Sequence, residues 1–484
     1  MSDSVIIIGI TLVYLIMVLV VGLRARGQSS SSLEGYVAGG RHVGVVILFF
    51  ILGAEIFSAF AFLGTPGWAY KHGAPAFYIL AYLSLVPITI WALGPRVAKL
   101  GRERGYLTQG DMIADHYRSK PLGMLAGIIG VVALVPYLTI QIAGAGLLFQ
   151  AATDGMVPFW LGGLLAFVVV AAYVFCSGLS GIGWTNLVQG VMMIAIAWFL
   201  GLAISERLYG GVGEMFTQLQ QQAPEYLTMP GATGMGWGYF STAVLVSAFG
   251  GAMWPHLFMK FYSADSGKTL RKVSVFYPLY AYLLVPLLFI GFAGILAFAD
   301  SPLERADTVL LKMVMEVANF SPWVIGLMLS GALAAAMSTG ANLAHTAAIV
   351  LVRDVMGPTV MKGASEKTTV SVTRWSVLGL SLAVMSAPAF SESATIAVAA
   401  NFTKTIDELE THLDKWLYVL KHMEKFDRIP EKIKDKIFQK VFNLAEYHKL
   451  SKEERKAYED SLKYYRDLKN SLDTAKDEGK KEGK

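Results

Sequence analysis

The feature of this sequence that most restricts its fold is a series of apolar runs, each about 20 residues long. An uncharged run of this length can cross the hydrocarbon core of a bilayer as a helix. The runs predict an all-α, polytopic membrane protein with ten membrane-spanning helices. The expected spans are 4–23, 43–70, 73–94, 121–151, 157–178, 182–203, 236–258, 273–299, 321–352 and 372–390.

Charged residues are concentrated in the C-terminal part of the chain. Residues 402–484 contain 20 of the 41 Lys and Arg residues and 18 of the 36 Asp and Glu residues. The preceding part has far fewer charges than a soluble domain, in which about a quarter of the residues are charged. We therefore expect two domains, a membrane domain at 1–400 and a charged helical tail at 401–484. The single cysteine excludes a disulfide framework, and the small net charge of +5 predicts no nucleic-acid partner.

Basic residues are unevenly distributed among the loops and predict the orientation of the spans. They gather after the first, third, seventh and ninth spans, at Arg24, Arg26, Arg41, Arg96, Lys99, Arg102, Arg104, Arg118, Lys120, Lys260, Lys268, Arg271, Lys272, Arg353, Lys362, Lys367 and Arg374. Loops rich in Lys and Arg stay in the cytoplasm. The chain is therefore expected in the cytoplasmic membrane with its N-terminus outside the cytoplasm. The first apolar run has no preceding basic residue and no small-residue cleavage site, so it predicts a retained span.

Two spans are interrupted in corresponding ways. The second span contains LGAEIFSAFAFLGTPG, with a predicted break at Gly64–Gly67, and the seventh contains SAFGGAMWPH, with paired glycines and Pro255. Broken helices free backbone groups that can bind a ligand at membrane depth. Their recurrence five spans apart is typical of an inverted-repeat secondary transporter. Ordinary Gly and Pro kinks, common in membrane helices, are the alternative interpretation.

The ninth span contains two adjacent hydroxyl residues in the sequence ALAAAMSTGANL. Ser338 and Thr339 follow Ala335 by three and four residues, so their side chains project from one side of a helix. Hard cations are bound by several oxygen atoms. Two hydroxyls and the carbonyls of a broken partner helix would suit sodium. The alternative is that both hydroxyls bond to their own helix backbone.

Four segments, ALAAAMSTGANL, VLVRDV, GWTNLVQGVMM and GGRHVG, resemble the sodium:solute symporter family. The resemblance covers about residues 5–400. It implies a core of five plus five inverted-repeat helices preceded by one extra helix. It also implies sodium as the coupling ion, held between the second and ninth spans. The implied ligands are the carbonyls of Ala54, Phe57 and Ala335 and the hydroxyls of Ser338 and Thr339.

The chain departs from the family pattern at Thr185–Asn186. Many members carry Thr-Asp at this place, and in some relatives the aspartate helps to bind a second sodium. An amide can still coordinate through its oxygen, but it lacks the negative charge. We therefore expect one sodium per transport cycle.

The transported solute is less strongly indicated than the ion. The segment WPHLFMKFYSADSGKTLRKV resembles the branch of the family that carries monocarboxylates and related organic acids. Helix N-termini at a break also favour an anionic group. Glu55, a carboxylate within a span, is a functional candidate by default, although its side chain can also point away from the cavity. The candidate substrate-binding residues are Ser58, Gln141, Trp254 and His256, and for Gln141 and His256 a purely structural role remains open.

The tail predicts soluble helices. One apolar face recurs at three- to four-residue spacing from Ile406 to Leu420, and Ser451 with Glu454 fits a capping box. Residues 402–484 resemble the C-terminal part of the recombination-promoting nuclease and transposase family, of the PD-(D/E)XK type. The resemblance begins after the part that would hold the metal-binding carboxylates and lysine. We therefore predict no nuclease activity and no enzyme.

These observations predict a fusion at about Ala400/Asn401, such as a mobile-element remnant inserted in frame into a symporter gene. The symporter part would end as its eleventh span begins, without the last core helix, and transport would be weak or absent. The leading hypothesis is sodium-coupled symport of a small organic solute, with monocarboxylates as candidates. The alternatives are a non-functional product of a disrupted symporter gene, a membrane receptor, or a tethered nuclease. A receptor would need a signalling output module, and the tail sequence contains none. A nuclease would need catalytic carboxylates and a basic face, and the tail sequence offers neither.

Overall fold

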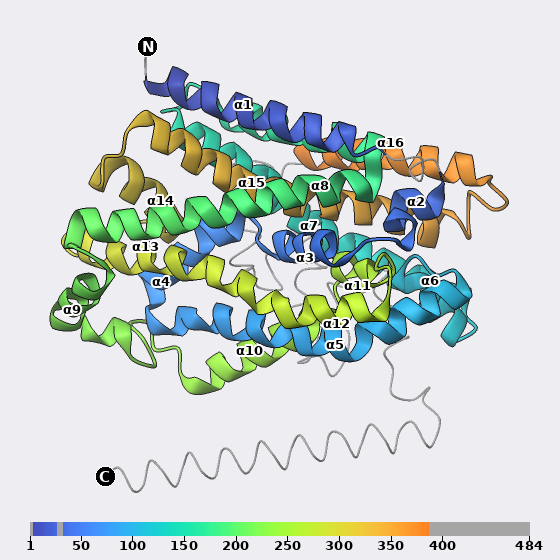
Figure 1. Cartoon of the computed structure of the whole chain (residues 1–484), viewed down its shortest axis with the longest axis horizontal. Helices are drawn as coiled ribbons and strands as arrows, with labels where there is room; N and C mark the ends of the chain where they lie inside the picture. Colours follow the sequence, from blue (N-terminus) through green and yellow to red (C-terminus); the bar gives the residue numbers. More distant parts are fainter. Residues whose placement is uncertain (1–2, 27–31, 387–484) are drawn as a thin grey trace, which may run out of the picture. The chain divides into compact units, whose positions relative to one another are not determined.

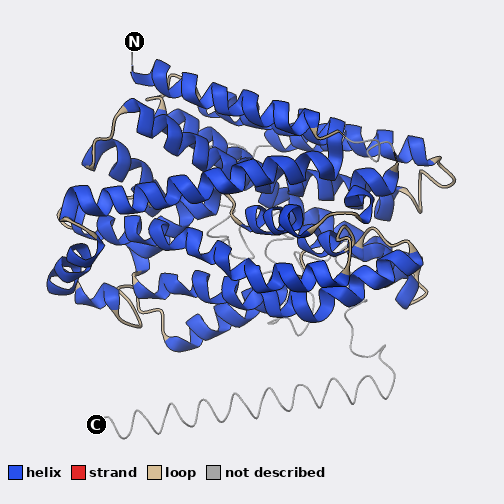
Figure 2. Cartoon of the chain, in the orientation of Figure 1, coloured by secondary structure: helices blue, strands red, loops and turns tan. Residues whose placement is uncertain are grey.

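The computed structural model describes residues 3–26 and 32–386, and this part consists of helices joined by turns and loops (Figures 1 and 2). Within these ranges the only β-type contact is an isolated parallel bridge between Val43 and Ala264. The start of the expected eleventh span and the whole tail lie outside the described residues. The predicted all-α fold is confirmed for the described part.

Seven helical segments of the described chain are long and apolar enough to cross a bilayer, and two bent helix pairs add two more. The seven are α1 (Asp3–Arg24), η4 with α5 (Ala74–Phe77, Tyr78–Arg104), α7 (Lys120–Ala152), α8 (Phe159–Tyr209), α12 through η6 to α13 (Gly267–Phe276, Tyr277–Leu283, Leu284–Ala297), α15 with η9 (Pro322–Val350, Leu351–Met356) and α16 (Glu366–Ser386). The bent pairs are α3 (Val45–Ile56) with η3 and α4 (Phe60–Gly64, Thr65–His72), and α10 (Trp237–Gly251) with α11 (Pro255–Phe261). Shorter helices are α2 (Leu33–Ala38), α6 (Gln109–His116), α9 (Val212–Gln222) and α14 (Val309–Lys312).

The helix α8 is too long to be one span. Its 51 residues extend about 76 Å at 1.5 Å per residue, more than twice the roughly 30 Å of hydrocarbon. Gly178 interrupts it with φ 56° and ψ −140°, so two helices meet at this residue. Counted as two spans, α8 brings the total in the described residues to ten, as predicted. The expected spans 157–178 and 182–203 left a short loop at 179–181. This loop is wrong, because residues 179–181 are helical and the break is confined to Gly178.

The helix α15 forms the centre of the bundle. Every residue from Met328 to Val350 is buried, and α15 packs against α1, α7 and α8 (Figure 1). The small residues of this helix allow such close approach. A Cβ atom on Gly340, for example, would lie 2.4 Å from the ring of Phe167.

The two interrupted spans bend by similar angles, 55° between α3 and α4 and 49° between α10 and α11. The second of these breaks lies between Gly251 and Pro255, as predicted. The first was placed wrongly, because helical structure stops at Phe57 and Ser58 rather than at 64–67. Pro66 instead lies in the first turn of α4, where a missing amide hydrogen costs no helical bond. A π-helical turn, η3, precedes it.

We predict that Gly178→Ala destabilises the protein. The backbone conformation at Gly178 is essentially restricted to glycine and costs another residue about 1–3 kcal/mol. In addition, the new Cβ would lie 2.6 Å from both the ring and the carbonyl oxygen of Tyr36. Thermal unfolding of the detergent-solubilised protein should therefore show a lower Tm. Gly9→Ala is the matched control, because a Cβ at Gly9 meets nothing within 4 Å. Equal Tm values for the two variants would contradict the prediction.

Candidate ion and substrate site

The last turn of α3 contacts the middle of α15. The break that follows leaves the final carbonyl groups of α3 without helical partners. The Ser338 Oγ lies within hydrogen-bonding distance of two carbonyl oxygens, that of Ala54 at 2.9 Å and that of Ala335 at 3.1 Å. The Thr339 Oγ1 donates a hydrogen bond to the carbonyl oxygen of Glu55 at 2.8 Å. Both hydroxyls therefore reach across to another helix and do not only bond to their own backbone.

Four of the five residues predicted to hold sodium meet at this contact, namely Ala54, Ala335, Ser338 and Thr339. The carbonyl of Glu55 also takes part, and the sequence interpretation did not identify it. The fifth predicted residue, Phe57, lies at the break itself, with φ −82° and ψ 79°. Its ring stacks on Tyr280 with 5.2 Å between the ring centroids.

The chemistry of this contact suits a hard cation. All five predicted residues are at most 2% exposed, and they offer only carbonyl and hydroxyl oxygens. Such oxygens are the ligands of alkali and alkaline-earth cations, whereas transition metals favour imidazole and thiolate ligands. No group of three or more His, Cys, Asp or Glu side chains that could hold a metal occurs among the described residues.

Two of the predicted substrate-binding residues satisfy the backbone of the first break. The Gln141 side chain on α7 is fully buried, and its Oε1 accepts a hydrogen bond from the Ala59 amide at 2.9 Å. The Ser58 Oγ accepts one from the Phe60 amide at 3.2 Å. Gln141 therefore has a structural partner, as the alternative interpretation proposed, and it also places α7 against the break.

The other two predicted substrate-binding residues, Trp254 and His256, lie at the second break and also contact α7. The rings of Trp254 and His256 are 5.5 Å apart between centroids. Each also contacts the ring of Tyr137, at 5.6 Å and 6.1 Å respectively. Tyr137 is one helical turn from Gln141, whose Nε2 donates to its carbonyl at 3.4 Å. The helix α7 thus joins both breaks, and the four candidates flank one stretch of it.

Trp254 and His256 differ in exposure. The Trp254 side chain is 42% exposed, whereas His256 is 3% exposed and its Nδ1 has no hydrogen-bond partner. Lys260, one turn further along α11, is only 2% exposed. The assignment of Lys260 to a basic loop is therefore wrong. Lys260 lies within the aromatic-rich run HLFMKFY, whose other side chains continue the apolar span past the charge.

Asn186, the residue that departs from the family pattern, is fully buried in α8. Neither its Oδ1 nor its Nδ2 has a hydrogen-bond partner. The neighbouring Thr185 hydroxyl lies near two carbonyls of its own helix, those of Gly181 at 3.0 Å and Ile182 at 3.1 Å. An amide oxygen is thus present at this position, without the charge of an aspartate.

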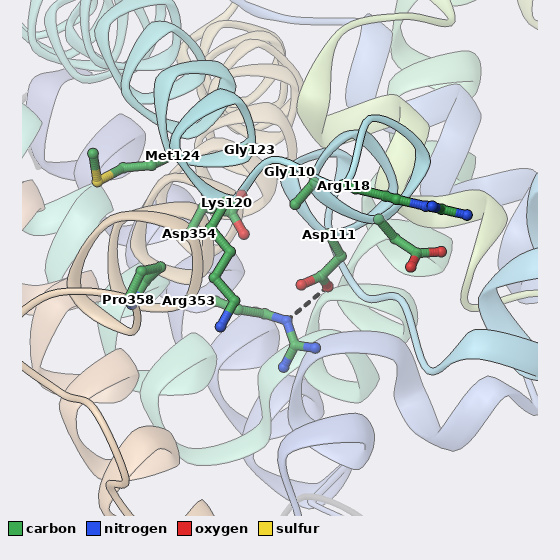
Figure 3. Close-up of a pocket in the computed structure, with 11 residues that line it drawn as sticks. Gly110, Asp111, Arg118, Lys120, Gly123, Met124, Arg353, Asp354 and Pro358 are labelled. Atoms are coloured by element: carbon green, nitrogen blue, oxygen red, sulfur yellow. Dashed lines mark hydrogen bonds and ion pairs between the residues drawn. The ribbon is translucent and has the colours of Figure 1, made fainter.

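A second polar contact, which the sequence interpretation missed, ties α6 to the end of the ninth span (Figure 3). The Arg353 Nε donates to Asp111 Oδ2 at 2.7 Å, and the Thr108 hydroxyl donates to Asp354 Oδ1 at 2.7 Å. The same oxygen of Asp111 accepts the amides of Leu107 and Thr108. We call Thr108, Asp111, Arg353 and Asp354 the α6 latch.

A cavity of about 560 Å³ lies at the α6 latch. Its wall carries side chains of both charges, including Arg118, Lys120 and Asp111 (Figure 3). Asp115 also lines it. The Tyr106 hydroxyl donates a hydrogen bond to Asp115, and Arg104 forms an ion pair with it at 2.7 Å. Together these partners lower the pKa of Asp115.

Comparison with known families gives two matches. The model of the sodium:solute symporter family matches residues 36–407, and that of the PD-(D/E)XK nuclease family transposases matches residues 398–475. Both resemblances expected from the sequence are confirmed.

Three curated relatives resemble the symporter part. An uncharacterized symporter of Bacillus subtilis, YhjB, is 35% identical over 345 residues, which cover 70% of this chain and 69% of the relative. A monocarboxylate transport permease protein of Rhizobium johnstonii is 28% identical, covering 68% of this chain and 67% of the relative. The sodium/proline symporter of Escherichia coli is 26% identical, covering 80% and 78%.

Among solved structures, that of a Na⁺-coupled sialic acid symporter matches with a TM-score of 0.66 and 16% sequence identity. The match covers 82% of this chain and 83% of the other. At this identity the likeness concerns the fold alone, and it confirms the predicted inverted-repeat transporter architecture. Family model, relatives and fold agree that this multi-pass membrane chain belongs to the sodium:solute symporter family.

Proposed function

We propose that this chain is a sodium-coupled symporter for a small organic anion, a monocarboxylate. The observation that carries the proposal is the contact of the Ser338 and Thr339 hydroxyls with the last carbonyls of α3. It gathers buried, uncharged oxygens where an interrupted span meets the central helix. The family match supports sodium as the coupling ion. The Rhizobium permease, named for monocarboxylate transport, supports the class of solute.

In this proposal the sodium ligands are the carbonyls of Ala54, Phe57 and Ala335 and the hydroxyls of Ser338 and Thr339. The hydroxyls keep lone pairs for an ion while their hydrogens remain bonded. The neutral side chain of Asn186 favours one sodium per cycle. The solute would lie between the two breaks, beside Ser58, Gln141, Trp254 and His256. There α7 supplies a polar contact at one break and an aromatic one at the other.

The orientation proposed from the basic loops places the N-terminus outside the cytoplasm. The α6 latch, with Arg104, Arg118 and Lys120 near it, would then lie on the cytoplasmic side. The join between the two matched families, at about residue 400, would replace the last core helix by the charged tail. We propose that this replacement weakens transport.

Removal of either hydroxyl should weaken sodium binding. In Ser338→Ala and Thr339→Ala, we expect the sodium concentration for half-maximal uptake to rise about tenfold, because losing one such oxygen contact is worth about 1–2 kcal/mol. Sodium-driven uptake into proteoliposomes measures this change. Ser330→Ala is the matched control, since the Ser330 hydroxyl is buried on the same helix but bonds only to the carbonyl of Gly326. An unchanged sodium dependence in both variants would show that the ion-site assignment is wrong.

The solute class can be tested with a panel of labelled monocarboxylates, amino acids and sugars under a sodium gradient. We expect the monocarboxylates to accumulate in proteoliposomes and the others not to. The intact chain should be compared with a version in which the spans of a relative replace the residues after 400. We expect higher uptake in the restored version. Equal uptake by both would reject the proposed weakening, and accumulation of amino acids or sugars alone would reject the anionic solute.

A further inference from the structure

One exposed face of α12 carries positive charges followed by apolar side chains. Lys268, Arg271 and Lys272 are exposed and stand three and four residues apart, so they share one face of the helix. The exposed side chains of Val275 and Phe276 continue this face one turn further into the span. We call these five residues the α12 stripe.

The three charges of the α12 stripe have no acidic partner in the described part of the chain. None of the ion pairs found there includes Lys268, Arg271 or Lys272. The nearest acid in the sequence, Asp265, accepts a hydrogen bond from the hydroxyl of Thr269. Lys268 also lies in the first turn of α12, where the helix dipole disfavours a positive charge. The cluster is therefore suited to an anion from outside the chain.

The neighbouring helix α5 adds an aromatic ring to the α12 stripe. The guanidinium of Arg271 lies over the ring of the exposed Trp91, 5.3 Å from its centroid. Tryptophan is enriched at the interface between membrane and water. The span that begins with α12 has 31 residues, which extend about 46 Å and exceed the roughly 30 Å of hydrocarbon. Its first turns, with their three charges, therefore belong at the level of the lipid headgroups.

A groove of about 550 Å³ lies at the first turn of α12, between this helix and the end of α5. Its charged residues are Lys99, Arg102, Glu103 and Asp265, two of each sign. Lys99 and Glu103 form an ion pair at 3.7 Å, and Arg102 donates a hydrogen bond to the carbonyl oxygen of Ala264. The charges of the groove thus compensate one another, and the unpaired positive charge belongs to the α12 stripe.

We propose that the α12 stripe binds an anionic glycerophospholipid. Its phosphate contacts Lys268, Arg271 and Lys272, because basic clusters at the membrane surface attract anionic headgroups. An acyl chain lies along Val275 and Phe276, so the stripe matches the order of charge and hydrocarbon in a lipid. The cation–π contact of Arg271 with α5 means that the lipid bridges two helices. This site does not depend on the proposed ion or solute.

The test is the binding of radiolabelled dioleoylphosphatidylglycerol to the purified full chain in detergent, compared with zwitterionic dioleoylphosphatidylcholine. The wild type should bind the anionic lipid about tenfold more tightly or better. Lys268→Gln, Arg271→Gln and Lys272→Gln should each weaken this binding about fivefold, the contribution of one cation near an anionic lipid surface. Trp91→Leu should weaken it about two- to fivefold through loss of the cation–π contact.

The controls separate the possible outcomes. Lys362→Gln and Lys367→Gln remove equally exposed charges from another basic region and should bind as the wild type. If the charges only fix the orientation of the span, the wild type will bind both lipids equally, and the inference is overturned. Anionic binding that persists in the combined variant without the three charges overturns it as well.

Two further measurements complete the test. Inorganic phosphate should not displace the lipid at equal concentration, and displacement would exclude a lipid as the ligand. The substituted side chains are exposed, so the variants should unfold at the Tm of the wild type. Where the combined variant does not fold, unchanged lipid binding in all three single variants overturns the inference.

Discussion

The structure depends on one constraint, that a helix interrupted inside a bilayer must find partners for the carbonyls it frees. Water is absent at this depth, so the partners must come from the protein. At the end of α3 they come from the hydroxyls of Ser338 and Thr339 on α15. Just beyond the break, the freed amide of Ala59 donates to the side-chain oxygen of Gln141 on α7. The same groups that make the break tolerable gather the oxygens that a cation needs. The helix break and the candidate ion site are therefore one feature of the fold.

The centre of the bundle is suited to presenting this feature. The helix α15 is buried over more than twenty consecutive residues and is made mainly of small side chains, so its neighbours approach closely and hold it in place. Different parts of this span have different roles. The middle of α15 supplies hydroxyls to the break, while η9, which continues it, carries Arg353 and Asp354 of the α6 latch.

The spans could be predicted from the sequence, because an uncharged apolar run of about 20 residues is typical of a membrane-spanning helix. The sequence also pointed to Ser338 and Thr339, whose hydroxyls the structure places against the last carbonyls of α3. The position of the first break was predicted wrongly because Gly64 and Pro66 are residue types that often break helices. Proline, however, also fits the first turn of a helix, where Pro66 lies. The α6 latch was missed for another reason. Thr108 and Asp111 are more than 240 residues away from Arg353 and Asp354 in the sequence, and only the packing of helices shows that they meet.

The uncharged oxygens of the ion contact bear on the energy source of transport. The membrane voltage does work only on net charge that crosses the bilayer, about 2.3 kcal/mol per elementary charge for 100 mV. The ligands proposed for sodium are carbonyls and hydroxyls and add no charge of their own, so the charge carried is that of the cargo. One sodium and one monoanion together carry no net charge, and the voltage would then contribute nothing to accumulation. Such a carrier would concentrate its solute only as far as the sodium concentration ratio allows, and it would work equally well in polarised and depolarised cells.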